Sequence, residues 1–202
     1  MTTNRVFLIT GASTGIGKAT ALRAAEAGFD LVLAARSEDE LRDVAREVGS
    51  DRCLTVRCDV QDFEAQQAMV KAAVERFGRI DVVFANAGIG GSPGGFSGAD
   101  HEAWKQMILT NVYGVGLTLK ATLPEVKKTK GHVLITGSVA GRRTLAGSMY
   151  SATKWAAGAI GYGLREELRG TGVRVTIIEP GVVDTPFFDD PKPDGLRPDD
   201  IA

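Results

Sequence analysis

Short apolar runs alternate with longer amphipathic segments along this chain, and the alternation predicts its secondary structure. Each run is four to six residues long, which is too short for a helix of a globular protein and suits a buried strand. The expected strands lie at residues 6–9, 31–35, 53–58, 81–85, 132–136 and 173–178. The expected helices lie at 15–28, from 37 onward, at 61–77, at 100–126 in one piece or two, and at 149–169.

Strands that alternate with helices in this way predict an α/β fold, a doubly wound parallel sheet with helices on both faces. Right-handed crossovers, together with a phosphate-type turn after the first strand, give the expected strand order 3-2-1-4-5-6. Ligands of such Rossmann-like sheets bind at the carboxyl ends of the strands, where the strand order reverses.

The turn after the first strand is rich in glycine, with Gly11, Gly15 and Gly17 close together. Free backbone N–H groups and the helix dipole make an anion site here, and its natural ligand is a phosphate or pyrophosphate. A nucleotidase-type phosphate loop is excluded, because Ala12 replaces its first glycine and Ala19 replaces its hydroxyl residue. The spacing Gly-x-x-x-Gly-x-Gly also differs from the fingerprint Gly-x-Gly-x-x-Gly.

Composition narrows the class of protein further. With 44% hydrophobic and 24% charged residues, the chain has the makeup of a globular protein. Its net charge of −1 gives no electrostatic support for nucleic-acid binding, and no apolar stretch reaches the length of a membrane span. Cys53 and Cys58 are expected on opposite faces of one strand, which disfavours a disulfide. No histidine or cysteine set has metal-ligand spacing, and the expected location is the reducing cytoplasm.

The strongest chemical signal is Tyr150, followed four residues later by Lys154 in the last expected helix. This spacing places both side chains on one face, where the ammonium should lower the phenol pKa toward the range useful for acid–base catalysis. Ser138, at the carboxyl end of the fifth strand, supplies a hydroxyl that can hold a carbonyl or alcohol oxygen. His132 opens that strand at its amino end and His101 lies near a helix start, so neither competes well for the role.

The glycine spacing and the segment from Tyr150 to Lys154 resemble those of the short-chain dehydrogenase/reductase family. The family's motifs occur in order over essentially the whole chain, although Ser138 and Tyr150 are one residue closer than is commonest. The resemblance implies an oxidoreductase that transfers a hydride between a nicotinamide cofactor and a small carbonyl or secondary alcohol substrate. The catalytic residues that it implies are Asn111, Ser138, Tyr150 and Lys154. In the family this asparagine anchors a water that links the lysine to solvent.

Two other functions stand beside this interpretation. A Ser-His-Asp hydrolase needs a Gly-x-Ser-x-Gly elbow and a histidine, but Gly137-Ser138-Val139 is not that elbow and no histidine follows Ser138. A nucleotide-binding regulator of the same fold, without turnover, is the remaining alternative. The presence of the whole catalytic set argues against it.

The end of the second strand predicts the cofactor. An NAD site usually has an acidic residue there for the ribose 2′-hydroxyl, whereas this chain has Ala35 and then Arg36. Arg36 can make charge-assisted hydrogen bonds to a 2′-phosphate, and in the resembled family this pattern goes with NADP (NADPH). Asp59 matches the family's adenine-contacting residue, or caps the following helix. The expected cofactor-binding residues are Gly11, Ser13, Thr14, Gly15, Ile16, Gly17, Arg36, Asp59, Val60, Asn86, Ala87, Gly88, Tyr150, Lys154, Pro180, Gly181, Val183 and Thr185.

The resemblance also implies a homodimer, paired through the helices at 100–126 and 149–169. A face of small residues that would allow close approach supports this expectation. That face consists of Trp155, Ala156, Ala157, Ala159 and Gly161.

We expect residues 1–202 to form a single NAD(P)-binding domain that carries both the cofactor and the substrate sites. Within it, 186–202 reads as a substrate-side loop and the start of an incomplete helix, and Phe187 and Phe188 are expected to line the substrate pocket. Members of the family continue into a seventh strand. Without that strand the one at 173–178 is an exposed edge, so we expect either a longer protein or cover from the 186–202 tail or a partner chain.

Overall fold

The computed structural model describes residues 4–91, 93–188 and 190–202, and these residues form one six-stranded parallel sheet. The strand order is β3-β2-β1-β4-β5-β6, as expected from the sequence. The order reverses between β1 and β4, so the carboxyl ends of these two strands flank the position where such sheets bind ligands. The strands are β1 (Val6–Thr10), β2 (Asp30–Ala35), β3 (Cys53–Arg57), β4 (Val82–Ala85), β5 (His132–Thr136) and β6 (Arg174–Ile178).

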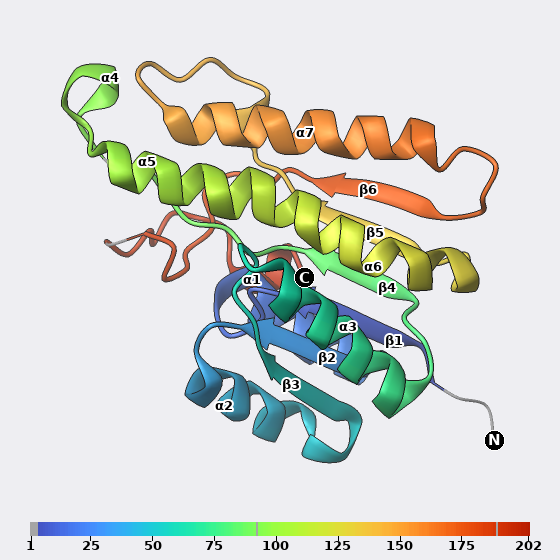
Figure 1. Cartoon of the computed structure of the whole chain (residues 1–202). Coiled ribbons are helices and arrows are strands. Elements are labelled where there is room, and N and C mark those ends of the chain that lie inside the picture. Colours follow the sequence, from blue (N-terminus) through green and yellow to red (C-terminus); the bar gives the residue numbers. More distant parts are fainter. Residues whose placement is uncertain (1–3, 92, 189) are drawn as a thin grey trace.

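Helices cover both faces of the sheet, and Figure 1 shows three layers. One face is covered by α1 (Gly15–Glu26) and α2 (Glu38–Val48), and the other by α3 (Phe63–Phe77), α6 (Val115–Thr129) and α7 (Met149–Glu167). Leu8 packs into the core under the second group of helices, and the next residue, Ile9, packs into the core under the first. Because the central strands are buried on both faces, their sequences are continuous apolar runs. The shorter helices are η1 (Ser50–Arg52), α4 (Gly95–Gly98), α5 (His101–Ile108), η3 (Val139–Gly141) and η4 (Pro198–Asp200).

Two of the expected helix caps are wrong. The helix α3 is capped by Asp62, whose carboxylate accepts hydrogen bonds from Glu64 N and Ala65 N, and not by Asp59. Asp59 accepts a hydrogen bond from Gln61 N in the turn before the helix. At the start of α2, the sequence spacing of Ser37 and Glu40 predicts a capping box, but Ser37 makes no capping hydrogen bond among the described residues.

The helix expected at 100–126 contains a π-helical stretch. It runs as α5, then as Leu109–Gly114 with π-helical hydrogen bonding, and then as α6 without leaving the helical backbone region. The sequence pattern allowed one helix or two, and the structure has one helix with a wider turn inside it. Such turns occur frequently at functional sites, and this one contains Asn111.

Strand β6 is less buried than the sequence indicates. It was expected to be covered on both faces, but Arg174 and Thr176 are exposed and only Val175 is fully buried. Within the described residues its hydrogen-bonded neighbour is β5, and the turn η4 packs against α1 rather than along β6.

The small-residue face expected on α7 is also divided. Ala157 and Gly161 face the protein's own sheet, since a Cβ on Gly161 would lie 2.6 Å from the Ile177 side chain. Trp155 and Ala159 are exposed on the opposite side of the helix. Only the second pair is available to another molecule.

Candidate functional site

The glycine turn between β1 and α1 adopts a backbone that favours glycine. Gly11 and Gly15 have φ values of 64° and 52°, in the left-handed region. A Cβ on Gly17 would lie 2.1 Å from the carbonyl oxygen of Gly11, so only glycine lets the first turn of α1 pack this closely on the loop. Within the described residues, Thr14 makes no side-chain capping bond and the first turn of α1 has no acidic residue. The amino end of α1 therefore keeps N–H groups for an anionic ligand.

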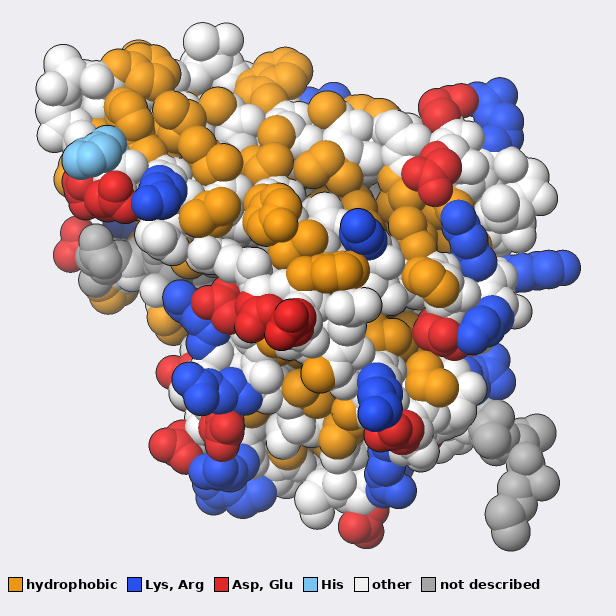
Figure 2. All heavy atoms as spheres, viewed as in Figure 1, with side chains coloured by type: hydrophobic (Ala, Val, Ile, Leu, Met, Phe, Trp, Pro, Cys, Tyr) orange, Lys and Arg blue, Asp and Glu red, His pale blue; other side chains and the backbone are white. Residues whose placement is uncertain are grey.

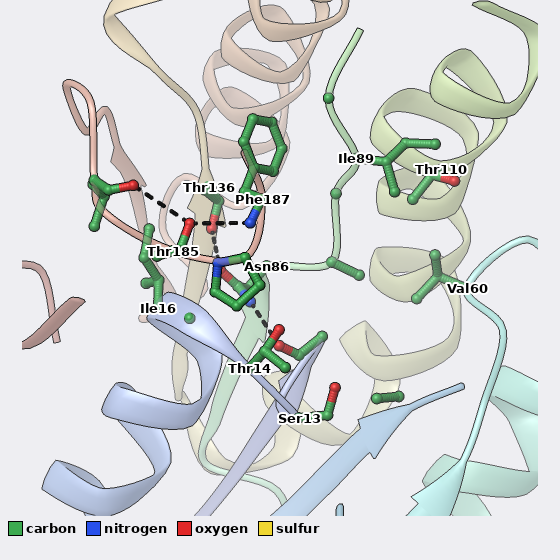
Figure 3. Close-up of a pocket in the computed structure, with 18 of the residues that line it drawn as sticks. Ser13, Thr14, Ile16, Val60, Asn86, Ile89, Thr110, Thr136, Thr185 and Phe187 are labelled. Carbon is green, nitrogen blue, oxygen red and sulfur yellow. Dashed lines mark hydrogen bonds between the residues drawn. The ribbon is translucent and has the colours of Figure 1, made fainter. Parts of the chain in front are cut away.

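Asn86 braces the strand ends around this turn. Its Nδ2 donates to the carbonyl oxygens of Thr10 (3.0 Å) and Gly11 (3.2 Å), and its Oδ1 accepts from Thr136 Oγ1 (3.0 Å). These bonds join the carboxyl ends of β1, β4 and β5, and Figure 3 shows Asn86 beside Thr136 at the centre of the site. The floor of the site is thus held by side-chain as well as ladder hydrogen bonds.

A cavity of about 540 Å³ opens at these strand ends. Of the residues expected from the sequence, all line it except Gly17, which packs beneath the turn, and Asn111. The sequence reasoning missed further lining residues, most of them neighbours of expected ones. They are Ala35, Ser37, Glu40, Cys58, Ile89, Gly90, Thr110, Thr136, Gly137 and Pro186.

One end of the cavity carries the charged side chains of Arg36, Glu40 and Asp59. Arg36 is exposed at the end of β2, where a ligand can approach its guanidinium. An anionic dinucleotide fits these donors, because the cavity runs from Arg36 past the amino end of α1. The turn from Gly11 to Gly17 contains no lysine or arginine, so the partial positive charge of the helix end supplies the attraction there.

The other end of the cavity brings together Tyr150, Ser138 and Lys154. The Ser138 hydroxyl hydrogen-bonds the Tyr150 phenol, although the loop between them is one residue shorter than is commonest in the resembled family. Lys154 Nζ lies 5.6 Å from the centre of the Tyr150 ring and donates to the carbonyl oxygen of Thr136 at 2.9 Å. Only 6% of Lys154 is exposed, and this burial lowers its pKa to about 8.

The pKa of Tyr150 is raised above its ordinary value, because burial has a larger effect than the hydrogen bond from Ser138 that lowers it. The expected fall of this pKa is therefore wrong for the structure described. The physical reason is that the ring and its lysine neighbour are both buried, and burial disfavours the phenolate and the ammonium alike.

Asn111 lies behind the cavity wall and fixes the segment after β4, which forms part of that wall. Its Nδ2 donates to the carbonyl oxygen of Ile89 and its Oδ1 accepts from Ile89 N, both at 2.9 Å. The same Nδ2 is 3.2 Å from Thr153 Oγ1, on the helix that carries Tyr150 and Lys154. Asn111 thus ties the segment after β4 to the catalytic helix.

The segment after β6 closes the cavity. Pro180 accepts a hydrogen bond from Val139 N at 3.0 Å, which joins this segment to the residue after Ser138. Thr185 lies against the glycine turn, since a Cβ on Gly15 would be 3.2 Å from its methyl group. Phe187 and Phe188 both line the cavity.

Other titratable groups lie apart from this site or are not reactive. His132 Nε2 is 2.8 Å from Thr176 Oγ1 at the amino end of β5, and His101 is exposed. Burial raises the pKa of Cys53 to about 12 and that of Cys58 to about 11, which keeps both thiols protonated. In the described ranges no group of acidic, histidine and cysteine residues could hold a metal ion. Nor does any described helix combine the length and apolar character needed to cross a membrane.

Comparisons with known proteins agree with this geometry. A family model described as short chain dehydrogenase matches residues 5–194. An uncharacterized oxidoreductase of Listeria monocytogenes is 39% identical over 193 residues, covering 92% of this chain and 77% of the relative. An alcohol dehydrogenase from the archaeon Thermococcus sibiricus, solved with 5-hydroxy-NADP, is 38% identical with a TM-score of 0.91, over 98% of this chain and 86% of that one. A 3-ketoacyl-(acyl-carrier-protein) reductase from Brucella melitensis, solved with NADH, is 31% identical with a TM-score of 0.90, over 97% and 86%.

Proposed function

This chain belongs to the short-chain dehydrogenase family, and on that premise we propose that it is an NADP-dependent oxidoreductase that interconverts a carbonyl group and an alcohol. One observation carries the proposal. A tyrosine phenol, a serine hydroxyl and a buried lysine ammonium meet at one end of a cavity whose other end has Arg36. The tyrosine, serine and lysine suit proton transfer to an oxygen, and Arg36 suits binding of a phosphorylated nucleotide.

Each residue has a separate role in this mechanism. A nicotinamide cofactor held in this cavity would supply the chemistry of hydride transfer at the substrate carbon. Ser138 and Tyr150 both donate to the substrate oxygen, and Tyr150 gives it a proton in reduction and takes one in oxidation. Lys154, held in place by Thr136, stabilises the phenolate that this transfer leaves. Asn111 acts as a positioning residue through Ile89 and Thr153.

NADP is the proposed cofactor because β2 ends in Ala35 and Arg36 without an acidic residue. A carboxylate at this position would repel a 2′-phosphate, whereas the guanidinium attracts one. The similar archaeal structure holds an NADP analogue and the similar Brucella structure holds NADH, so Arg36 and not the fold carries this part of the proposal.

The test is oxidation of NADPH, followed by its near-ultraviolet absorbance, against a panel of uncharged and charged ketones and aldehydes. Tyr150→Phe should lower turnover by roughly 10²- to 10⁴-fold and leave NADPH binding in place. Tyr113→Phe, which removes a hydroxyl from an exposed tyrosine outside the cavity, is the matched control. Activity that survives Tyr150→Phe would overturn the mechanism, and NADPH binding without turnover on any substrate would favour a regulator of the same fold.

We also propose a homodimer, on the evidence of the apolar surface formed by α5, the π-helical stretch Leu109–Gly114 that follows it, and α7. Figure 2 shows hydrophobic side chains gathered over these helices. The large members of this surface are Ile108, Tyr113, Trp155 and Tyr162, each at least 41% exposed. Apolar surface of this kind, on neighbouring helices, is what a self-complementary contact needs.

A further inference from the structure

The cavity has two ends of different chemistry. The charged side chains of Arg36, Glu40 and Asp59 lie at the end away from the catalytic tyrosine, and Lys154 lies beside that tyrosine. At the other end, the Tyr150 ring lies beside the apolar ring of Phe187, and both line the cavity. Lys154 is buried, and one of its three N–H groups donates to the carbonyl oxygen of Thr136.

Phe187 forms the wall nearest to the reacting position. Its ring centre is 5.6 Å from that of Tyr150, at an interplanar angle of 57°. The ring lies over the loop at Gly90, where an added Cβ would be 3.4 Å from the Cζ atom of Phe187. Phe188 supports it from behind with an edge-to-face contact at 5.2 Å.

Ile89 lines the cavity on the segment after β4. Figure 3 shows its side chain directed toward Thr110, away from Phe187, which comes from the segment after β6. The main chain of Ile89 is fixed by both hydrogen bonds of Asn111, so this part of the cavity lining has a defined position. A substrate whose oxygen reaches Tyr150 and Ser138 places its neighbouring group beside Phe187, whose ring centre is 5.6 Å from that of Tyr150.

We propose, on the basis of the function proposed above, that the substrate is an uncharged ketone, aldehyde or alcohol with an aromatic ring or bulky alkyl group on the reacting carbon, and that Phe187 selects it. An anionic group packed against the Phe187 ring would lose water there, and the ring offers it no hydrogen-bond donor in return. An aromatic ring would pack on Phe187 in the tilted or edge geometry that aromatic pairs prefer.

The first experiment compares acetophenone with 4-acetylbenzoate, which differ only by a carboxylate. We expect kcat/KM with NADPH to be at least about tenfold higher for acetophenone. Phe187→Ala should lower kcat/KM for acetophenone by roughly fivefold to tenfold, mainly through KM, and should affect butanone much less. Phe96→Ala is the matched control, because Phe96 is 67% exposed and lies outside the cavity lining.

The second experiment measures binding without turnover. Calorimetry on the NADPH complex should show 1-phenylethanol binding more tightly than 4-(1-hydroxyethyl)benzoate, and Phe187→Ala should remove most of the difference in favour of the aromatic ligand. Equal or tighter binding of the carboxylate, or no effect of Phe187→Ala, would overturn the inference. Since this measurement needs no catalysis, failure of the proposed activity would appear separately, as NADPH complexes that bind the alcohol and reduce no ketone.

Discussion

Arg142 and Glu179 form an ion pair that joins the two loops on either side of the catalytic end of the cavity. Arg142 Nε lies 2.7 Å from Glu179 Oε1, and the same guanidinium hydrogen-bonds the hydroxyl of Tyr162 on α7. Arg142 follows Ser138 by four residues, and Glu179 directly precedes Pro180. The pair therefore links the segment that holds the substrate oxygen to the segment that closes over the cofactor site.

Removing this link should affect the rate more than cofactor binding. In Glu179→Gln the charge is lost while the shape is kept, and we expect kcat to fall several-fold because Ser138 is held less firmly. The bond from Val139 N to Pro180 remains, so a loss larger than roughly tenfold is not expected. Steady-state kinetics and NADPH titration measure the two effects. Glu166→Gln breaks the comparable ion pair with Arg169 at the end of α7 and should change neither; equal kinetics in both variants would contradict the role given to Arg142.

Arg36→Ala should change the choice of cofactor. A hydrogen bond between charged groups contributes about 1.5–3 kcal/mol, so the Kd for NADPH should rise by roughly tenfold to 100-fold. The Kd for NADH, which has no 2′-phosphate, should change little. Fluorescence titration with both nucleotides checks this, and Arg42→Ala, which removes an arginine ion-paired within α2 and outside the cavity lining, is the control. Equal weakening of both nucleotides would show that Arg36 does not distinguish them.

Lys154→Met should stabilise the folded protein while abolishing turnover. Burial disfavours the Lys154 ammonium, so an apolar side chain of similar length should raise the free energy of unfolding at pH 7 by about 1–2 kcal/mol. Between its folded pKa of about 8 and the ordinary lysine pKa of roughly 10.4, the unfolded chain holds a proton that the folded protein has released. Wild-type stability therefore rises with pH across this range relative to the variant.

Calorimetric melting of both proteins at several pH values measures this effect. The Tm advantage of Lys154→Met should be largest at neutral pH and should shrink toward pH 10. Lys71→Met, at an exposed position of α3, serves as the control and should show no such trend. An advantage that grows with pH would mean that the buried ammonium is not the source of the cost.

The apolar surface on α5, the π-helical stretch Leu109–Gly114 and α7 should mediate dimerisation. Light scattering at micromolar concentration should give a mass near twice the 21.4 kDa of one chain. Trp155→Glu together with Tyr113→Glu should shift the mass to that of a monomer, because each places a charge in the contact. Arg46→Glu, at an exposed position of α2 on the other face of the sheet, should leave the mass unchanged. A wild-type protein that scatters as a monomer would refute the dimer.

The sequence predicted the strand order and most of the cavity lining for one physical reason. Parallel strands buried on both faces have continuous apolar sequences, and the residues that follow these sequences converge at one edge of the sheet. Asn86, Ser138 and Pro180 each come directly after, or shortly after, a strand, and all three line the cavity. Their chain positions were sufficient to bring them together.

The features that the sequence did not predict depend on how the side chains pack in the folded protein. Asp59 and Asp62 are both able to cap α3, and only the packing of the preceding turn decides for Asp62. The small residues of α7 were expected to form one face for a partner, but the Ile177 side chain from β6 packs against Gly161. The pKa of Tyr150 depends mainly on how deeply its own ring is buried, which residue spacing does not reveal.

The π-helical turn at Leu109–Gly114 lengthens this helix by one residue and leaves the faces that α5 and α6 present to their neighbours unchanged. A π-helical turn accommodates one residue more than an α-turn, and the flanking helices keep their facing. Deleting one residue here would leave α5 against α7 and α6 against α3 while making the hydrogen bonding regular. Asn111 would then lose its reach to Ile89, and the wall of the cavity would lose its fixed position. Relatives that differ by a single residue in this turn should therefore share the fold and differ in how firmly they hold a substrate.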